Sequence, residues 1–277
     1  MFKKFLSVFL SLLLVVGLVA CGGGTTTMTI TESNEQGETQ TKVVQVGNLK
    51  QQLQNAVTVT DMNIEYERDK NDQFINEAHY NNDKLSTVFF GSYPQSDASG
   101  YTKDPIEWYV LEKNDSKALL LSKYILDTKP YNNDDVDITW ENCSLRDWLN
   151  NDFYNYAFSN NEKNNILDTN VVNNDNEEYG TKGGNNTKDK IFLLSADECK
   201  NYLVNFKSIN TTGTSYAPAN YQWWLRSPGS KQSYARLAES GAWSNPVGWI
   251  AYGGSDLWKR HGGSGYAGVR PALWVKY

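Results

Sequence analysis

The sequence predicts an α+β domain, and three observations lead to this prediction. Short apolar segments with strand character come first, within residues 86–122. Helix-start signals gather in the middle of the chain, within residues 144–198, and a strand-like segment closes it at residues 269–275. Early strands, central helices and a closing strand are typical of a fold whose two chain ends meet in one sheet.

The first twenty residues have the features of a secretory signal. Lys3 and Lys4 precede a run over residues 5–20 that is apolar apart from two serines and a glycine. A membrane-spanning anchor is the alternative, but it needs roughly 20 apolar residues, and the pattern here is that of a cleaved signal. Leu-Val-Ala-Cys at residues 18–21 matches a bacterial lipobox. We therefore expect export, lipidation at Cys21 and an outward-facing anchor on the bacterial cell membrane.

The chain divides into four predicted segments. Residues 1–20 are the signal peptide, and residues 21–42, which have few large apolar side chains, form a flexible tether. Residues 43–84 show some helical spacing and are then mostly polar, which indicates a weakly ordered stalk or an N-terminal addition. Residues 85–277 form one folded domain.

The predicted domain begins with strands. One ends at Gly91, and residues 106–111 and 117–122 form a hairpin through a polar turn. Residues 191–195 are apolar enough for a buried strand. Pro271 interrupts the closing segment, so that segment needs an edge or irregular position.

Three helix starts are predicted. An amphipathic helix opens at Ser144, with large apolar side chains of its first turns on one face. These side chains are Leu145, Trp148 and Leu149. The capping-box pattern, Ser followed three residues later by Glu, marks two further starts at Ser159 and Ser195. A polar stretch over residues 171–190 reads as a surface excursion.

Charge and cysteine content narrow the possible partners. The chain has 26 Lys and Arg against 32 Asp and Glu, a net charge of −6. This sign argues against phosphate-driven binding of nucleic acid. Beyond Cys21 the cysteines are Cys143 and Cys199. An exported protein permits a disulfide between them, although two isolated cysteines are more often small buried hydrophobes.

Six segments resemble one bacterial family of unknown function. They are FGSYPQ at 90–95, PIEWYVL at 105–111, ALLLSKYILD at 118–127, TWENCSLRDWLNNDFY at 139–154, WWLRSPG at 223–229 and GVRPALW at 268–274. In this order they are similar to the domain-of-unknown-function family 6273 over residues 86–277. The C-terminal pattern of that family is similar to C-type-lectin-like and formylglycine-generating-enzyme-like (sulfatase-modifying-factor) domains. The resemblance implies a C-type-lectin-like fold with paired termini and long irregular loops that present ligand-binding residues.

Residues 240–268 carry large side chains among glycines and serines. Rigid aromatic anchors spaced by small residues have the chemistry of an antibody paratope. By analogy of position, the stretch falls where diversity-generating retroelements place the variable region of lectin-fold proteins. The expected ligand-binding residues are Trp243, Trp249, Tyr252, Trp258, Arg260, His261 and Tyr266. An ordinary glycine-rich region that packs its tryptophans inward remains the alternative.

The strongest motifs contribute expected scaffold residues. These are Trp223, Trp224, Arg226, Arg270 and Trp274. The two arginines could contact an anion or ligand, or they could satisfy loop carbonyls or a carboxylate beneath the binding face. We favour the second interpretation.

Signatures of catalysis and metal binding are missing from the sequence. His79 and His261 are the two histidines, and neither belongs to a metal-ligand motif. A formal GxGxxG at residues 263–268 precedes Val-Arg-Pro rather than a helix. The acidic clusters at residues 134–137 and 175–178 lack the spacing of a calcium loop. We expect no catalytic residues, no metal and no cofactor.

These observations predict a membrane-tethered surface lipoprotein that is not an enzyme. Its lectin-like domain would bind a protein or glycan through the C-terminal stretch. Two alternatives stay open, namely an enzyme of the sulfatase-modifying-factor type with an unrecognised site and a structural envelope protein.

Overall fold

A computed structural model describes most of the domain predicted from the sequence. Backbone and side chains are described for residues 48–54, 56–58, 85–203, 211–218, 222–238 and 267–277. The backbone alone is described for residues 19–20, 26–33, 39–46, 204, 239, 249–256 and 266.

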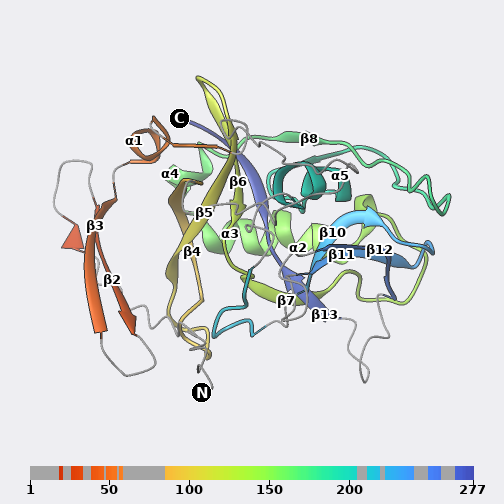
Figure 1. Cartoon of the computed structure of the whole chain (residues 1–277), viewed down its shortest axis with the longest axis horizontal. Coiled ribbons are helices and arrows are strands. Elements are labelled where there is room, and N and C mark those ends of the chain that lie inside the picture. The colour runs from red at the N-terminus through yellow and green to blue at the C-terminus, as the bar shows by residue number, and fades with distance from the viewer. Residues whose placement is uncertain are drawn as a thin grey trace, which may run out of the picture.

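A four-stranded antiparallel sheet, in the order β14-β6-β5-β4, brings the start and the end of the domain together. Its strands are β4 (Thr87–Tyr93), β5 (Asp104–Lys113), β6 (Lys117–Ser122) and β14 (Ala272–Lys276). The predicted hairpin is β5–β6, and β14 pairs with β6 along its whole length. Figure 1 shows β14 running beside β6. The two ends of the domain therefore share one sheet, but they do not pair with each other as expected, because β4 and β14 lie at its opposite edges.

The first strand runs past its predicted end. β4 buries Val88, Phe90 and Tyr93 and pairs with β5 across a register shift between Phe89 and Ser92. Gly91 lies in this shift with a φ of 71°, which favours glycine. The irregularity re-aims the end of the strand, and Tyr93 is buried there.

A second sheet has five strands in the order β12-β11-β10-β13-β7. They are β7 (Asp127–Pro130), β10 (Gln222–Pro228), β11 (Tyr234–Glu239), β12 (Trp249–Asp256) and β13 (Tyr266–Val269). The β10–β13 pair is parallel and the other pairs are antiparallel. A small hairpin, β8 (Thr169–Val171) with β9 (Thr187–Asp189), frames the polar excursion.

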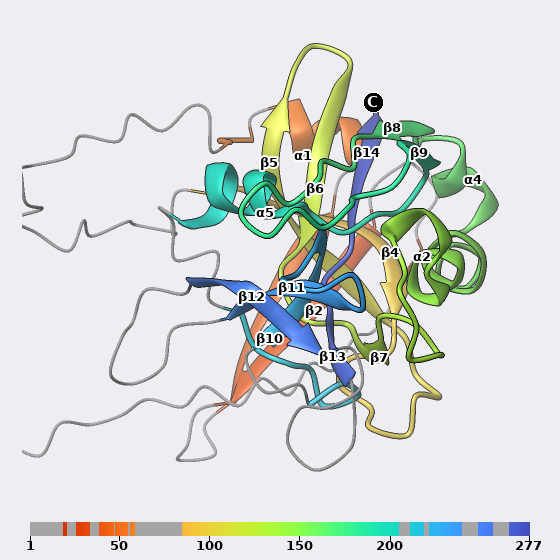
Figure 2. The same ribbon diagram turned by 90° about the vertical axis from the view of Figure 1, so that its right-hand side faces the viewer.

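The predicted helix starts are confirmed. A continuous helical run consists of α2 (Ser144–Trp148), the π-helical turn η4 (Leu149–Phe153) and α3 (Tyr154–Ala157), and the short turn η3 (Trp140–Asn142) precedes it. Both capping boxes are formed, at Ser159 before α4 (Asn160–Lys163) and at Ser195 before α5 (Ala196–Cys199), which continues into η5 (Lys200–Val204). Figure 2 shows the helical run on one side of the domain, near β4, with α5 on the other side.

Two predicted strands differ from the structure. Residues 191–195 are largely buried, but they form only one bridge, between Phe192 and Ala272. The closing segment is broken at Arg270 and Pro271 into β13 and β14. Proline has no N–H to donate to a ladder, and this break is the irregular position predicted for it.

The folded domain includes residues that precede Leu85. In α1 (Leu49–Gln54) the side chains of Leu49 and Leu53 are buried in the main core. The Gln52 side chain accepts from Phe89 N at 2.7 Å and donates to Phe89 O at 3.2 Å. This part of the predicted stalk, residues 43–84, therefore packs on β4, because its two leucines share one helix face.

The segment predicted as a tether, residues 21–42, contains strand backbone. β2 (Thr26–Ser33) and β3 (Thr39–Val46) pair as a hairpin, and β1 (Val19–Ala20) pairs with β2. Their threonines and valines favour strands over other structure. Within the described residues, no helix is long and apolar enough to cross a membrane.

Candidate functional site

Three of the seven predicted ligand-binding residues lie in strands that the structure describes. Trp249 and Tyr252 lie in β12, and Tyr266 begins β13, all three described by backbone alone. The remaining four lie outside the described residues; they are Trp243, Trp258, Arg260 and His261. The predicted lipidation site, Cys21, also lies outside them. The expectation of an irregular stretch is wrong for residues 249–256, because they pair with β11 from Glu239 to Tyr234. The aromatic and β-branched residues of WIAY suit a strand.

The scaffold residues of the strongest motifs lie in the core. Trp223 and Trp224 are each 1% exposed, and the Trp224 indole N–H donates to Lys129 O at 2.8 Å. Trp274 is partly buried, with the Lys117 ammonium 4.4 Å from its ring centroid. These tryptophans connect β10 and β14 to neighbouring strands.

The two motif arginines are buried and contact protein groups. The Arg226 guanidinium donates hydrogen bonds to both carboxylate oxygens of Glu198 and to the backbone oxygens of Leu193 and Val172. Arg270 donates to Ser122 O at 2.8 Å and lies 5.0 Å from the Trp223 ring, and burial lowers its pKa to about 10. Such contacts match the structural interpretation of both residues.

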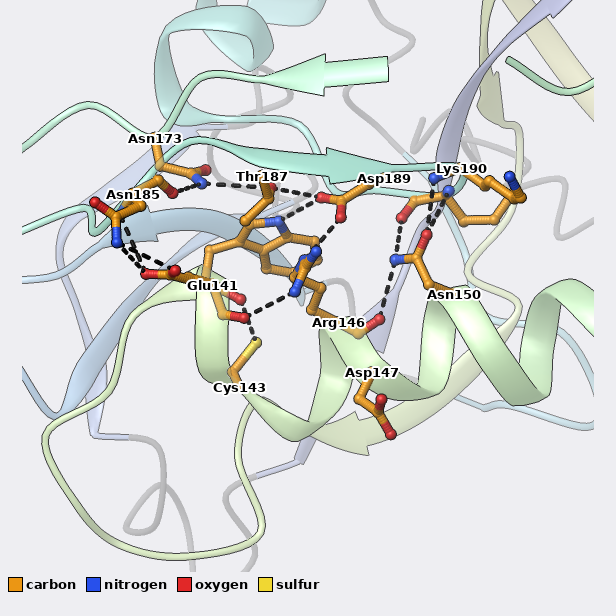
Figure 3. Close-up of polar contacts among 12 residues, drawn as sticks. Glu141, Cys143, Arg146, Asp147, Asn150, Asn173, Asn185, Thr187, Asp189 and Lys190 are labelled. Atoms are coloured by element: carbon orange, nitrogen blue, oxygen red, sulfur yellow. Dashed lines mark hydrogen bonds and ion pairs between the residues drawn. The ribbon is translucent and has the colours of Figure 1, made fainter. Parts of the chain in front are cut away.

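A buried carboxylate organises the motif that contains the long helical run. The Asp189 side chain accepts from Trp140 Nε1 at 2.9 Å, Thr187 Oγ1 at 2.8 Å and Arg146 Nε at 2.7 Å. Figure 3 shows Arg146 of α2 and Thr187 of β9 converging on Asp189. Trp140 belongs to η3. Arg146 compensates the buried charge, and its Nη1 also donates to Glu141 O at 2.8 Å.

Asn150 fastens the same helical run to the segment after β9. Its amide nitrogen donates to Arg146 O and Ile191 O, and its amide oxygen accepts from Lys190 N and Ile191 N. Figure 3 shows Asn150 between the helix and Lys190. The run that starts at Ser144 is therefore held at a fixed position against the rest of the domain.

The two cysteines of the domain are free and buried. Cys143 Sγ donates to Trp140 O at 3.4 Å. Desolvation raises the pKa of each thiol, of Cys143 and of Cys199, to about 12. A thiol in this state is a poor nucleophile, so both residues serve as small core side chains.

An open hollow lies beside the helical run, and we call it the aromatic groove. It has a volume of about 500 Å³. Its lining consists of Tyr93, Trp148, Asn151, Asp152, Phe153, Asn155 and Tyr156. Six of these seven residues come from α2, η4 and α3, and Tyr93 comes from the end of β4.

The aromatic rings of the groove pack on one another as a continuous wall. Ring centroids lie 5.0 Å apart for Tyr93 and Phe153, 5.7 Å for Tyr93 and Tyr156, and 5.5 Å for Trp148 and Phe153. Tyr93 donates its hydroxyl to Asp127 Oδ2 at 2.5 Å. Burial, reinforced by the Asp127 charge, raises the Tyr93 pKa, so this phenol stays neutral.

Sequence analysis missed the groove. Helical spacing assigned Trp148 to the core with Leu145 and Leu149, but Trp148 is only partly buried and lines the groove. Tyr93 and Tyr156 were not singled out. The signal that could have indicated it is the composition of residues 150–156, NNDFYNY, where aromatic side chains alternate with amides and a carboxylate. A helix that only packs on a core does not need this mixture.

Metal ligands do not gather in the part of the chain that the structure describes. No group of three or more His, Cys, Asp or Glu side chains there could hold a metal ion. Asp175, from one of the acidic clusters, instead pairs with Lys182 at 2.7 Å.

Comparison with known proteins gives one match. The family model described as "Domain of unknown function (DUF6273)" matches residues 115–277, more than half of the chain. Four of the six quoted segments fall inside this range, and those at 90–95 and 105–111 precede it. No curated protein and no solved structure matches the chain.

Proposed function

The chain belongs to the DUF6273 family, a domain of unknown function matched over residues 115–277, and from this premise we propose that it is a surface lipoprotein with a binding domain. The domain would have a C-type-lectin-like fold. It would bind a protein or glycan through strand β12 and its flanking residues 240–248 and 257–265, which we call the C-terminal face.

The position of β12 is the observation that supports this proposal. β12 is the outer strand of the five-stranded sheet, and among the described residues it pairs only with β11. An outer strand leaves backbone N–H and C=O groups available for a partner. Segments with three of the predicted anchors, Trp243, Trp258 and Arg260, join β12 at its two ends.

Cysteine chemistry argues against a sulfatase-modifying-factor activity. Enzymes of that type depend on a reactive pair of cysteines. Here Cys143 and Cys199 are buried, with pKa values raised to about 12. A thiolate is the reactive form, so these two residues do not supply such a nucleophile.

The binding proposal is tested with an array of glycans and proteins. Residues 21–277 carrying Cys21→Ala, which lack both the lipid and the apolar segment 5–20, are compared with the same chain carrying Trp258→Ala and His261→Ala in addition. We expect specific hits whose signal falls when the two side chains are removed, because aromatic anchors dominate such interfaces. Hits that are insensitive to both substitutions, or no hits, would overturn the proposed face.

The anchoring proposal has its own test. Replacing Cys21 by Ala in the producing bacterium removes the only lipidation site that the lipobox offers. We expect the variant protein to leave the membrane fraction, since acyl chains supply the attachment. Retention in the membrane after washes with high salt and carbonate would contradict lipid anchoring.

A variable region of the retroelement type is a finer proposal about the C-terminal face. It requires a reverse transcriptase gene near the coding sequence and a near-repeat of the segment that encodes residues 240–268. Sequencing the locus in related strains decides it, since a diversified region differs at scattered codons within this stretch and an ordinary one does not.

A further inference from the structure

We propose that the aromatic groove is a second ligand site, separate from the C-terminal face, and that it binds a neutral pyranose sugar of a glycan chain. The ring of a pyranose has an apolar face of C–H groups and an edge of hydroxyls. A site for it therefore needs exposed aromatic rings beside hydrogen-bond donors and acceptors.

The size and wall of the groove suit such a ligand. Its volume of about 500 Å³ lies within the range of roughly 300–1,000 Å³ typical of small-molecule sites. Trp148 is partly buried and Tyr156 is 46% exposed. A lysine ammonium lies over one face of each ring, so a ligand would use the ring surface that remains. Phe153, which is 1% exposed, lies behind them and closes the wall.

Polar atoms at the rim retain unused hydrogen-bonding capacity. Asn151 uses its amide nitrogen on Asp147 Oδ1 at 2.8 Å, and Asn155 uses its amide oxygen to accept from Lys163 Nζ at 3.0 Å. Within the described structure, the Asn151 oxygen, the Asn155 nitrogen and the Asp152 carboxylate make no hydrogen bond. Two acceptors and one donor at an aromatic wall match hydroxyl groups, which both donate and accept.

Charges of both signs border the groove, so neither a cationic nor an anionic ligand is matched by charge of one sign. The Lys129 ammonium lies 4.3 Å from the Trp148 ring centroid, and that of Lys103 lies 3.4 Å from the Tyr156 centroid. A quaternary ammonium, the other common ligand of aromatic sites, would meet two like charges at these rings. An anion would instead face Asp152, which lines the groove.

The groove is also held rigid before any ligand binds. Asn150 bonds the helical run to Ile191 and Lys190, and the Tyr93 hydroxyl is fixed by Asp127. A preorganised wall avoids the entropic cost of ordering side chains on binding.

The test is calorimetric titration of the full chain in detergent with neutral oligosaccharides. The probes are cellohexaose, maltohexaose and chitohexaose, with choline and oligogalacturonate as charged comparisons. Tyr156→Ala and Asn155→Ala remove a ring and an amide from the groove. Tyr179→Ala is the matched control, since Tyr179 is 45% exposed and lies in the β8–β9 excursion.

We expect at least one neutral oligosaccharide to bind and both groove substitutions to weaken its binding by roughly tenfold or more. Tyr179→Ala should leave that binding unchanged, whereas binding that falls with Trp258→Ala and not with the groove substitutions would belong to the C-terminal face and would contradict the proposal. Thermal unfolding of each variant shows whether it remains folded. If Tyr156→Ala does not fold, Asn155→Ala still tests the groove, because Asn155 is at an exposed position. Binding of only choline or oligogalacturonate, binding that ignores the groove substitutions, or binding of no probe would overturn the proposal.

Discussion

Asp189 is a buried side chain whose two carboxylate oxygens both accept hydrogen bonds. Its carboxylate is fully buried and is surrounded by an indole N–H, a hydroxyl and the Arg146 guanidinium. Removing one member of such a cluster leaves the others desolvated without a partner, which costs more than the net value of the bonds themselves.

We therefore expect Asp189→Ala to lower the free energy of unfolding by about 3 kcal/mol. Asp168→Ala is the matched control, because Asp168 also pairs with a cation, Lys190, but its side chain is 50% exposed. The control should stay within roughly 1 kcal/mol of the wild type. Urea unfolding of both variants measures the difference. Equal effects would show that Asp189 has no special role.

The two buried thiols predict how the stability of the fold changes at alkaline pH. Burial raises the pKa of Cys143 from its ordinary value of 9.0 to about 12, and Cys199 behaves alike. Between these values the unfolded chain loses the thiol protons while the folded chain keeps them, so stability falls as the pH rises through this window.

Thiol reactivity is the direct readout of this burial. In the folded protein at about pH 8, iodoacetamide should leave Cys143 and Cys199 unmodified, and it should label both after unfolding in urea. Mass spectrometry of the two peptides reports the result. Rapid labelling of either residue in the folded protein would mean that it is accessible and ionised.

The helical run from Ser144 to Ala157 shows how one secondary-structure element can support both the core and a surface site. Its inner face buries Leu145, Leu149 and Phe153, and its outer face lines the aromatic groove. The π-helical turn η4 lies at the junction of these two roles. Such turns occur frequently at functional sites.

Two adjacent asparagines in η4 test this division. Asn150 makes four hydrogen bonds to backbone groups, whereas Asn151 is exposed and contacts only Asp147. We expect Asn150→Ala to destabilise the fold by about 2 kcal/mol and Asn151→Ala to stay within about 0.5 kcal/mol. Thermal unfolding compares them, and a reversed order would contradict the anchoring role given to Asn150.

Local patterns in the sequence predicted the starts of the helices better than they predicted the aromatic groove. The capping boxes at Ser159 and Ser195 need only contacts three residues apart, so their sequence pattern was sufficient. Trp148 has the same spacing as a core residue, but the groove that it lines also needs Tyr93, which β4 brings against Phe153 and Tyr156. That contact joins residues far apart in the chain, and no local pattern encodes it.

The extent of the domain depends on a similar distant contact. Residues 43–84 look mostly polar, yet Leu53 is fully buried against the core and Lys113 Nζ donates to its backbone oxygen at 3.2 Å. A helix of six residues has little stability alone, so α1 forms because β4 and β5 provide its packing surface.

Substitution in α1 tests whether this segment belongs to the domain. Leu53→Ala should cost roughly 2–5 kcal/mol, as for other buried leucines. Lys50→Ala, an exposed position in the same helix, should change stability by about 0.5 kcal/mol or less. Chemical unfolding of the two variants is the measurement. If Leu53→Ala leaves the stability unchanged, residues 49–54 are not part of the folded domain and the prediction of a stalk stands.

The account of the protein as a binding module depends on the C-terminal face being outward and the motif strands being core. The measurement that separates them is thermal unfolding combined with binding to an array hit, for Trp258→Ala, Arg260→Ala and His261→Ala beside Trp223→Ala and Trp224→Ala. The three face variants should stay within about 0.5 kcal/mol of wild-type stability, and at least two should lose roughly 2 kcal/mol or more of binding. The buried tryptophan variants should lose about 3–5 kcal/mol of stability. Face variants that unfold as readily as Trp223→Ala would show that the stretch is packing and not a binding surface.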